Sequence, residues 1–190
     1  MSSKDKILDT AQDLFYRNGY LSTSVDDIIG NAGVSKSNFY YHFKTKEDLG
    51  LFVLDQRKED LQQMLQLTLD NHSLAPKERL QNYLSMTLDA QAARLNKGGC
   101  PLGNLVAEMA EHSERFRCRL SSMFENLHLQ ITELIIEGQH SGQFRNDVEA
   151  SALAHMIVQT IQGMHLMTKC YKSVDNFGKT APLLVKLISA

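Results

Sequence analysis

Residues 23–49 of the chain read TSVDDIIGNAGVSKSNFYYHFKTKEDL. The apolar spacing in this stretch predicts two short helices, about Val25–Ala32 and Ser35–His42, with Ser24 as the N-cap of the first. Gly33 lies between them, where a helix commonly ends in the left-handed conformation. Two short helices joined by a glycine-containing turn are the helix-turn-helix pattern. Periodicity alone does not separate a DNA-reading helix-turn-helix from an ordinary helical corner, so both interpretations stay open here.

Helical spacing continues on both sides of this stretch. Ser3 is placed to cap a first helix that ends at Gly19, and Thr45 with Asp48 can form the capping box of a long fourth helix. That fourth helix covers about 46–70, and further helices are expected at about 76–96, from 101, and at 114–137, 146–172 and 183–188, with a break at 175–179. The predicted fold is all-α, with an N-terminal three-helix helix-turn-helix domain (1–46) joined by the continuous fourth helix to a C-terminal helical bundle (47–190).

The composition excludes several classes of protein. The chain has 190 residues with 11 glycines and 3 prolines, too few for the many turns of an all-β sandwich. No apolar run is long enough to span a bilayer, and the N-terminal segment lacks the apolar core of a signal peptide, so a cytoplasmic protein without a membrane partner is expected. Three cysteines without a CxxC pair argue against a disulfide framework or a zinc site. Catalytic and nucleotide-binding motifs are missing, so we expect neither an enzyme nor a bound cofactor or metal.

A basic window lies inside this chain of formal net charge −2. Residues 34–46 contain Lys36, Lys44 and Lys46, with His42 between them, and no carboxylate. Binding of nucleic acid depends on local potential, which a charge sum does not describe. The window therefore indicates a candidate surface for phosphate groups.

The second helix of the pattern, KSNFYYHF, has two distinct sides. At 100° per residue, Phe39 and Phe43 lie on one side and are expected to anchor the helix, through Leu14 and Phe15 of the first helix. Lys36, Ser37, Tyr40 and Tyr41 span a separate arc, whose ammonium, hydroxyl and phenol groups suit phosphates and base edges. The alternative is a pair of tyrosines half-buried in a helical corner, which leaves the polar face without a role.

The stretch 23–49, together with LFYRNGY at 14–20, resembles the DNA-binding domain of the TetR/AcrR family of bacterial transcriptional regulators, and the match covers about residues 3–52. The resemblance implies an all-α, dimeric and usually repressing protein with a variable ligand-binding C-terminal part. It also implies that the third helix faces DNA and that Ser24 contacts a backbone phosphate. With the basic window, the candidate DNA-contact residues are Ser24, Ser35, Lys36, Ser37, Asn38, Tyr40, Tyr41, His42, Lys44 and Lys46.

The segment KGGCPLGNLVAEMAE, residues 97–111, resembles a subgroup of that family in which some members respond to electrophiles or oxidants. Cys100 is expected at a helix N-terminus near Lys97, and both features favour the thiolate. Alternatively, Cys100 is a small buried residue that packs a turn. Cys118 and Cys170 lie in helical apolar patterns and are expected to be inert.

The C-terminal part is rich in methionine, which adapts to varied partners. An adaptable apolar pocket is one interpretation, and an ordinary core is the other. The candidate pocket residues are Tyr83, Met86, Cys100, Leu105, Met109, Phe116, Met123, Met156, Met164 and His165. The candidate dimer residues, on the last two long helices, are Leu153, Ile157, Ile161, Leu183 and Leu187.

These expectations combine into one hypothesis, a homodimeric transcriptional repressor that reads a palindromic operator with its third helix. An unidentified small apolar or electrophilic effector would move the fourth helix and release the DNA. The alternatives are an activator or effector-independent DNA binder, a helical sensor whose DNA face is vestigial, and a thiol-based sensor acting through Cys100.

Overall fold

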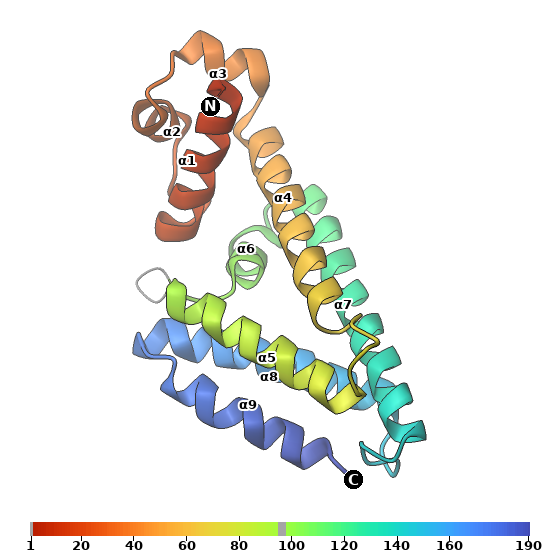
Figure 1. Ribbon diagram of the computed structural model, residues 1–190. Helices are drawn as coiled ribbons and strands as arrows, with labels where there is room; N and C mark the ends of the chain where they lie inside the picture. Colours follow the sequence, from red (N-terminus) through yellow and green to blue (C-terminus); the bar gives the residue numbers. More distant parts are fainter. Residues whose placement is uncertain (1, 95–97) are drawn as a thin grey trace. The chain divides into compact units, whose positions relative to one another are not determined.

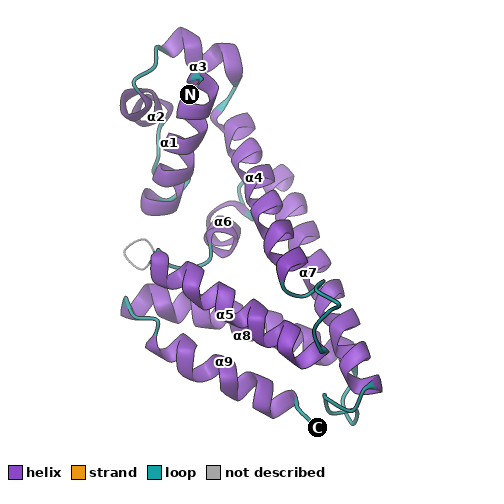
Figure 2. Cartoon of the chain, viewed as in Figure 1, coloured by secondary structure: helices purple, strands orange, loops and turns teal. Residues whose placement is uncertain are grey.

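The computed structural model describes residues 2–94 and 98–190, and this part of the chain is helical without a strand (Figures 1 and 2). An isolated antiparallel bridge joins Phe144 and Ser189. The helices are α1 (Ser3–Asn18), α2 (Val25–Ala32), α3 (Lys36–His42), α4 (Lys46–Leu67), α5 (Pro76–Ala93), α6 (Pro101–Met109), α7 (Glu114–His140), α8 (Ala150–Tyr171) and α9 (Asp175–Ile188). The all-α prediction is confirmed. None of the described helices is long and apolar enough to cross a membrane.

The chain forms two compact units, which are described separately. The first comprises residues 1–59 and 101–120, and the second comprises 60–100 and 121–190. Both α4 and α7 continue from one unit into the other. This division differs from the predicted boundary at residue 46, because the start of α4, α6 and the start of α7 belong to the same compact unit as α1–α3. Whether residues 1–46 fold as a separate domain stays a prediction.

The first unit is built around a core of large apolar side chains from several helices. Ile7 of α1, Ile28 of α2, Phe39 of α3, Leu49 of α4 and Phe116 of α7 are all fully buried. Full burial of side chains this large stabilises a unit by roughly 1.5–3 kcal/mol each. The core therefore fixes α1, α2 and α3 against the beginning of α4.

The N-terminal cap of α1 differs from the prediction by one residue. Ser2 is the N-cap and forms a reciprocal capping box with Asp5, while Ser3 already belongs to the helix. The Ser3 hydroxyl instead accepts a hydrogen bond from Asn38 Nδ2 at 3.2 Å. This bond connects α1 to α3.

The second unit surrounds a core from α4, α5, α7, α8 and α9, with α5 and α8 both packed beside α9 (Figure 1). The prediction for α9 is wrong at its start, because the helix begins at Asp175 and runs through the predicted break at 175–179. Phe177 is fully buried and packs edge-on against His165 at 5.6 Å between ring centroids. Burial of this aromatic side chain stabilises the first helical turn of α9, although the local sequence there favours a loop.

Candidate nucleic-acid interface

The α2–α3 turn is determined by three local features. Ser24 caps α2 in a capping box with Asp27, as its hydroxyl accepts the Asp27 N–H at 3.0 Å and donates to the carboxylate at 2.6 Å. Gly33 ends α2 with φ 64°, a left-handed conformation that favours glycine. Ser35 caps α3 by accepting the Asn38 N–H at 3.2 Å. These features place α3 directly after a tight turn, and the predicted helix-turn-helix geometry is confirmed.

The rotation of α3 about its axis is fixed by two phenylalanines. Phe39 is fully buried, and Phe43 is buried next to it, with 6.1 Å between the ring centroids. Phe43 also packs edge-on against Phe52 of α4 at 6.0 Å. Aromatic pairs at these distances prefer edge-on or tilted arrangements. The predicted buried arc of α3 is confirmed, and the opposite arc therefore faces outward.

That outward arc carries hydroxyl, phenol and ammonium groups. Tyr41 is 84% exposed and Tyr40 is 47% exposed, which is unusual for aromatic side chains of this size. Lys36 is exposed, and its Nζ lies 3.5 Å from Asp26 Oδ1, an ion pair so open to solvent that it contributes little to stability. The other exposed members of the predicted set are Ser35, Ser37 and Lys44, and His42 is partly exposed. Helix α3 itself contains no carboxylate.

Three of the predicted DNA-contact residues already form side-chain hydrogen bonds within the first unit. The Ser24 hydroxyl, although exposed, is engaged with Asp27. Asn38 is partly buried, and its Nδ2 donates to Ser3 of α1. Lys46 Nζ donates to the carbonyls of Tyr20 at 2.9 Å and Thr23 at 2.8 Å. These bonds leave Lys46 little freedom to reach a phosphate, in contrast to the expectation from the sequence.

Lys46 therefore connects the first residue of α4 to the loop between α1 and α2. Its ammonium also lies 4.4 Å from the centroid of the Tyr20 ring. Burial lowers the pKa of Lys46, and the nearby Glu108 carboxylate opposes part of this change. Burial also raises the pKa of Tyr20 to about 12. Lys46 holds the α1–α2 loop, and with it the beginning of α2, at a fixed position relative to α4.

Glu108 of α6 contacts the same loop, and the sequence did not indicate it. Its carboxylate accepts the Leu21 N–H at 3.0 Å. Gly19 has φ 89°, and a Cβ there would lie 2.9 Å from both carboxylate oxygens. The backbone conformation requires glycine at this position, whereas the Glu108 carboxylate ends a flexible side chain and can shift. The partners are far apart in sequence, so no local pattern could reveal the contact.

The start of α7 is bound to the start of α4 through charged groups. Arg115 donates to Glu47 at 3.0 Å and to Asp48 at 3.3 Å, and the Ser113 hydroxyl donates to Glu47 at 2.5 Å. The hydrogen bond with Glu47 is the largest cause of the raised pKa of Arg115. Tyr20 and Phe116 pack edge-on beneath these groups at 5.1 Å between centroids. Within the first unit, α6 and α7 thus contact the segments that position α2 and α3.

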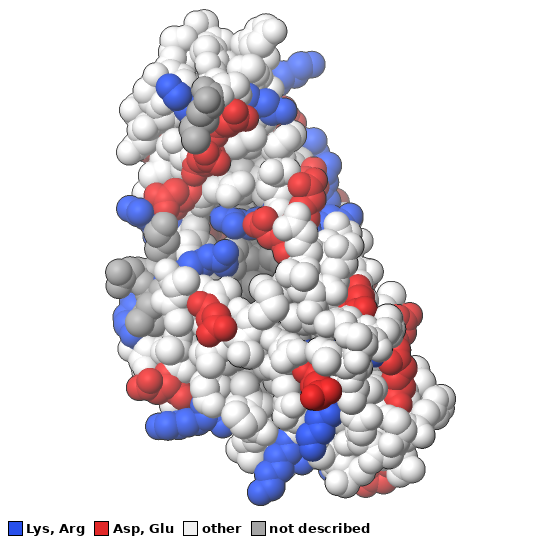
Figure 3. Space-filling model, in the orientation of Figure 1, with Lys and Arg blue, Asp and Glu red and all other residues white. Residues whose placement is uncertain are grey.

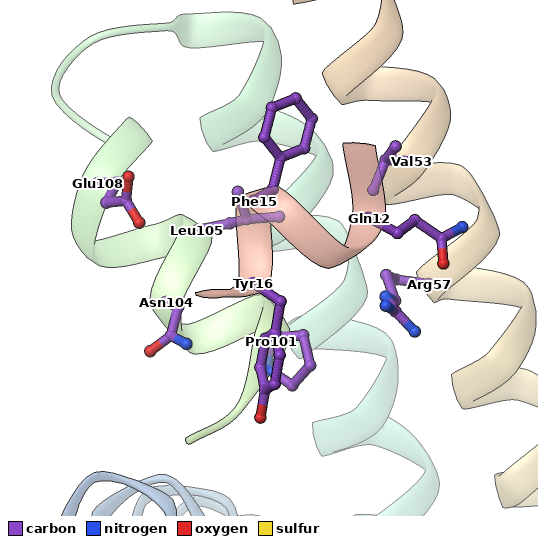
Figure 4. A pocket seen from close by; sticks show the side chains of 9 residues that line it. All are labelled: Gln12, Phe15, Tyr16, Val53, Arg57, Pro101, Asn104, Leu105 and Glu108. Carbon is purple, nitrogen blue, oxygen red and sulfur yellow. The ribbon is translucent and has the colours of Figure 1, made fainter. Parts of the chain in front are cut away.

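A small pocket lies between α1, α4 and α6 (Figure 4). Its volume is about 20 Å³, which is room for about one water molecule. The lining residues are Gln12, Phe15, Tyr16, Val53, Arg57, Pro101, Asn104, Leu105 and Glu108. The pocket is too small for an organic effector.

The candidate effector residues are divided between the two units. Leu105, Met109 and Phe116 are buried in the first unit. In the second unit Tyr83, Met123, Met164 and His165 are buried, and Met86 and Cys100 are partly buried. Met156 is 38% exposed on α8, and its place in an effector pocket stays a prediction. Lys97, expected beside Cys100, lies outside the described residues.

The candidate dimer residues fall into two groups. Leu153, Ile157 and Ile161 of α8 are buried in the core of the second unit and offer little surface to a second chain, so their place in a dimer interface stays a prediction. Leu183 and Leu187 of α9 are more than half exposed. Their place on the surface fits an interface.

The charged side chains do not gather into one area of a single sign on the face shown in Figure 3, where basic and acidic groups are intermixed. Among the described residues, no group of three histidine, cysteine or carboxylate side chains is arranged to hold a metal ion. The α3 surface is therefore identified by its exposed tyrosines and its lack of carboxylates, and not by the overall distribution of charge.

Comparison with known proteins agrees with this architecture. Residues 7–51 match the family described as bacterial regulatory proteins, tetR family, and residues 76–182 match the family described as tetracyclin repressor-like, C-terminal domain. The HTH-type transcriptional repressor DhaR of Mycobacterium sp. (strain GP1) is 33% identical over 166 residues, which cover 87% of this chain and 82% of the relative. The HTH-type transcriptional regulator QacR of Staphylococcus aureus (strain Mu50) is 32% identical, over 79% of this chain and 78% of the relative. The crystal structure of regulatory protein TetR from Rhodobacter sphaeroides superposes with a TM-score of 0.89 over 97% of both chains, at 26% identity. The chain belongs to the TetR family of DNA-binding bacterial transcriptional regulators.

Proposed function

We propose that the protein is a homodimeric, effector-responsive repressor whose α3 enters the major groove of a palindromic operator. The observation that carries this proposal is the outward arc of α3, on which Lys36, Tyr40 and Tyr41 are exposed while Phe39 anchors the opposite side. Phenols and hydroxyls bind base edges and phosphates, and the lysines supply phosphate contacts. The proposed contact residues are Ser35, Lys36, Ser37, Tyr40, Tyr41, His42 and Lys44, with Ser24, Asn38 and Lys46 supporting them from within the unit.

The proposed dimer uses a surface of α8 and α9. Exposed apolar side chains lie on both helices, which pack against each other in the second unit. Exposed apolar surface of this extent typically marks an interaction site. We name this the α8–α9 face, and its residues are Met156, Gly163, Leu166, Met167, Leu183 and Leu187. A second copy with the same face would make the two-fold symmetric contact that a palindromic operator requires.

The proposed response passes through continuous helices. Helix α4 runs without interruption from Lys46 to Leu67, so a shift of its C-terminal part reaches the residue that holds the α1–α2 loop. Glu108 of α6 contacts the same loop. An effector that prefers the shifted state would lower DNA affinity by its difference in affinity for the two states.

A thiol-based response through Cys100 is the second candidate. Cys100 is partly buried and directly precedes α6, the helix that carries Glu108. Cys118 and Cys170 are exposed, contrary to the expectation of apolar surroundings. Cys118 donates to Glu114 at 3.2 Å, and this hydrogen bond raises the pKa of its thiol and disfavours the reactive thiolate. Cys100 is therefore the position from which a modification would act on α6 through the chain itself.

The experiment that tests the proposed function is a titration of DNA from upstream of the protein's own reading frame. A repressor should shift this DNA as a dimer and ignore an unrelated duplex of equal length. Leu183→Glu, on the exposed part of α9, should yield monomers in sedimentation and weaken binding. Failure to distinguish the upstream DNA from the unrelated duplex would refute the proposal, and specific binding by a monomer would refute the dimer.

A further inference from the structure

Buried side-chain polar atoms without a hydrogen bond are found in both units of the described chain: Asn38 Oδ1 in the first unit, and four atoms in the second, of which Gln130 Oε1 lies on α7. Among the described residues, Gln91 Oε1, His165 Nδ1 and Thr168 Oγ1 are enclosed and form no hydrogen bond within the chain. The three side chains are 2%, 7% and 1% exposed, respectively. Burial of a polar group without a hydrogen bond destabilises a protein, so such atoms call for an explanation.

Contacts of Gly98 and Gly99, which follow α5 in the chain, place these three atoms at the same end of the second unit. Gln91 Nε2 donates to the Gly99 carbonyl at 3.1 Å. The adjacent Gly98 packs against α8, where a Cβ would lie 3.1 Å from the Cα of Lys169, the residue after Thr168. His165 precedes Thr168 by nearly one helical turn on the buried side of α8. Gln91, His165 and Thr168 thus lie near one end of the unit, and we call them the polar triad.

The buried side chains around the polar triad are apolar or neutral. Tyr83 and Thr87 lie on the same buried side of α5 as Gln91. Burial raises the pKa of the Tyr83 phenol, and the Cys100 thiol nearby raises it further, so the phenol stays neutral. Phe177 packs edge-on against His165, and the buried Met164 precedes it on α8. Burial lowers the pKa of His165 to about 4, which keeps the imidazole uncharged at neutral pH.

None of the described side chains around the polar triad is both charged and buried, since Lys169, which packs against Gly98, is exposed. The buried charged side chain among the described residues is Arg79, at the start of α5. Its guanidinium already donates to the Leu69 carbonyl and to Glu137. A carboxylate or ammonium ligand would therefore be buried beside the polar triad without a counter-charge, at a large cost in desolvation.

We propose that the polar triad binds the effector, and that this effector is a compact, uncharged molecule carrying hydroxyl or amide N–H groups on an apolar skeleton. Gln91 Oε1 accepts a hydrogen bond from it, Thr168 donates or accepts one, and the neutral imidazole of His165 supplies a further partner. Met164 and Phe177 contact the apolar part. The proposal rests on the proposed function, because it assigns a chemistry to the effector of that regulator.

Thr168→Val tests the proposal, because it replaces the unpartnered hydroxyl by a methyl group of nearly the same size. The matched control is Thr68→Val, also in a fully buried site of the second unit, where the hydroxyl already donates to the Met64 carbonyl at 2.7 Å. The probes share a skeleton and differ in one group: benzyl alcohol, benzamide, benzoate, benzylamine and toluene, with the corresponding butyl compounds. Binding is measured by ligand-observed NMR and calorimetry on the full-length protein without DNA.

The expected result is that alcohols or amides bind the wild type and the Thr68→Val variant, and bind Thr168→Val about tenfold more weakly, as for one lost hydrogen bond. Without ligand, Thr168→Val should melt no lower than the wild type, because it removes an unpartnered group. The proposal is overturned if no probe binds, if benzoate or benzylamine binds best, or if Thr168→Val binds every probe like the wild type. The last result would also follow if a single water occupies the region. Binding that leaves DNA affinity unchanged would support the site and count against effector-controlled release.

Discussion

Gly50 in α4 is the position where a single methyl group tests the packing that supports the DNA-binding helices. A Cβ at Gly50 would lie 2.6 Å from Tyr20 Cε2 and 2.8 Å from Phe116 Cζ. Ordinary carbon–carbon contact begins at about 3.5 Å, so each ring must retreat by roughly 0.7–0.9 Å. Neither ring can move freely, because both are buried and Tyr20 also packs against Phe15 at 4.9 Å. Gly50→Ala must therefore push α4 away from Tyr20 and Phe116.

Gly30 provides the matched control for this substitution. It lies inside α2, and a Cβ there would meet nothing within 4 Å. Replacing glycine by alanine inside a helix gains about 1 kcal/mol from intrinsic propensity. At Gly50 the same gain is opposed by overpacking of roughly 1–3 kcal/mol. We therefore expect Gly30→Ala to be more stable than the wild type, and Gly50→Ala to be less stable than Gly30→Ala by about 1–3 kcal/mol, which is that overpacking cost.

Urea unfolding followed by circular dichroism, with all three proteins at one concentration, measures this difference. The DNA affinity of the Gly50→Ala variant should also fall, because Tyr20 contributes a carbonyl that accepts a hydrogen bond from Lys46. If Gly50→Ala is as stable as Gly30→Ala, the contact of α4 with Tyr20 and Phe116 is not as described. Helix α3 would then not depend on this contact for its support.

The remaining predictions concern α3, a buried histidine and the cysteines. Tyr40→Ala should lose about 1–3 kcal/mol of operator binding with an unchanged melting temperature, whereas Phe39→Ala should lose about 3–5 kcal/mol of stability. Calorimetric melting and a DNA titration check both variants. A Phe39→Ala variant that melts like the wild type would contradict the assigned rotation of α3. Because the pKa of His165 falls from about 6.5 in the unfolded chain to about 4 in the fold, its contribution to stability is complete above pH 6.5 and declines as the pH falls toward 4. The wild type should thus lose up to about 1.4 kcal/mol per pH unit in this window relative to His165→Leu, and parallel stability curves for the two proteins would exclude a neutral buried imidazole. If Cys100 is a sensor, an alkylating reagent should modify it under native conditions before Cys118, and this modification should release DNA. Mass spectrometric mapping of the labelled cysteines, together with a gel shift, measures both effects. Slow labelling of Cys100 that leaves DNA bound would show that Cys100 is structural.

Much of the helix-turn-helix was predictable because it depends on neighbours in sequence. The cap at Ser24, the left-handed Gly33 and the spacing of Phe39 and Phe43 are all local features. Local rules also indicated which side of α3 would be exposed. The α3 part of the candidate interface followed from the sequence for this reason.

The errors arose where distant parts of the chain decide the outcome. The start of α9 depends on burial of Phe177, which no local propensity reveals. Apolar spacing in α8 showed that Ile157 is buried, but not that its neighbours come from the same chain. From the sequence, Lys46 was expected to contact DNA, whereas in the structure its ammonium donates to two carbonyls of an earlier loop. Glu108 was overlooked because its partner, Leu21, lies in that same loop and is 87 residues away in sequence.

The salt dependence of binding to the upstream DNA tests the central claim, that the exposed side of α3 binds a duplex in both subunits. Because Lys46 is bonded inside the first unit, Lys36, Lys44 and His42 remain for phosphates, which gives about four to six contacts per dimer. A plot of log affinity against log salt concentration should therefore have a slope of about −4 to −5, and Lys36→Ala should make it shallower by about 2 for the dimer. A wild-type slope shallower than about −2, or a slope unchanged by Lys36→Ala, would show that this surface does not bind the DNA.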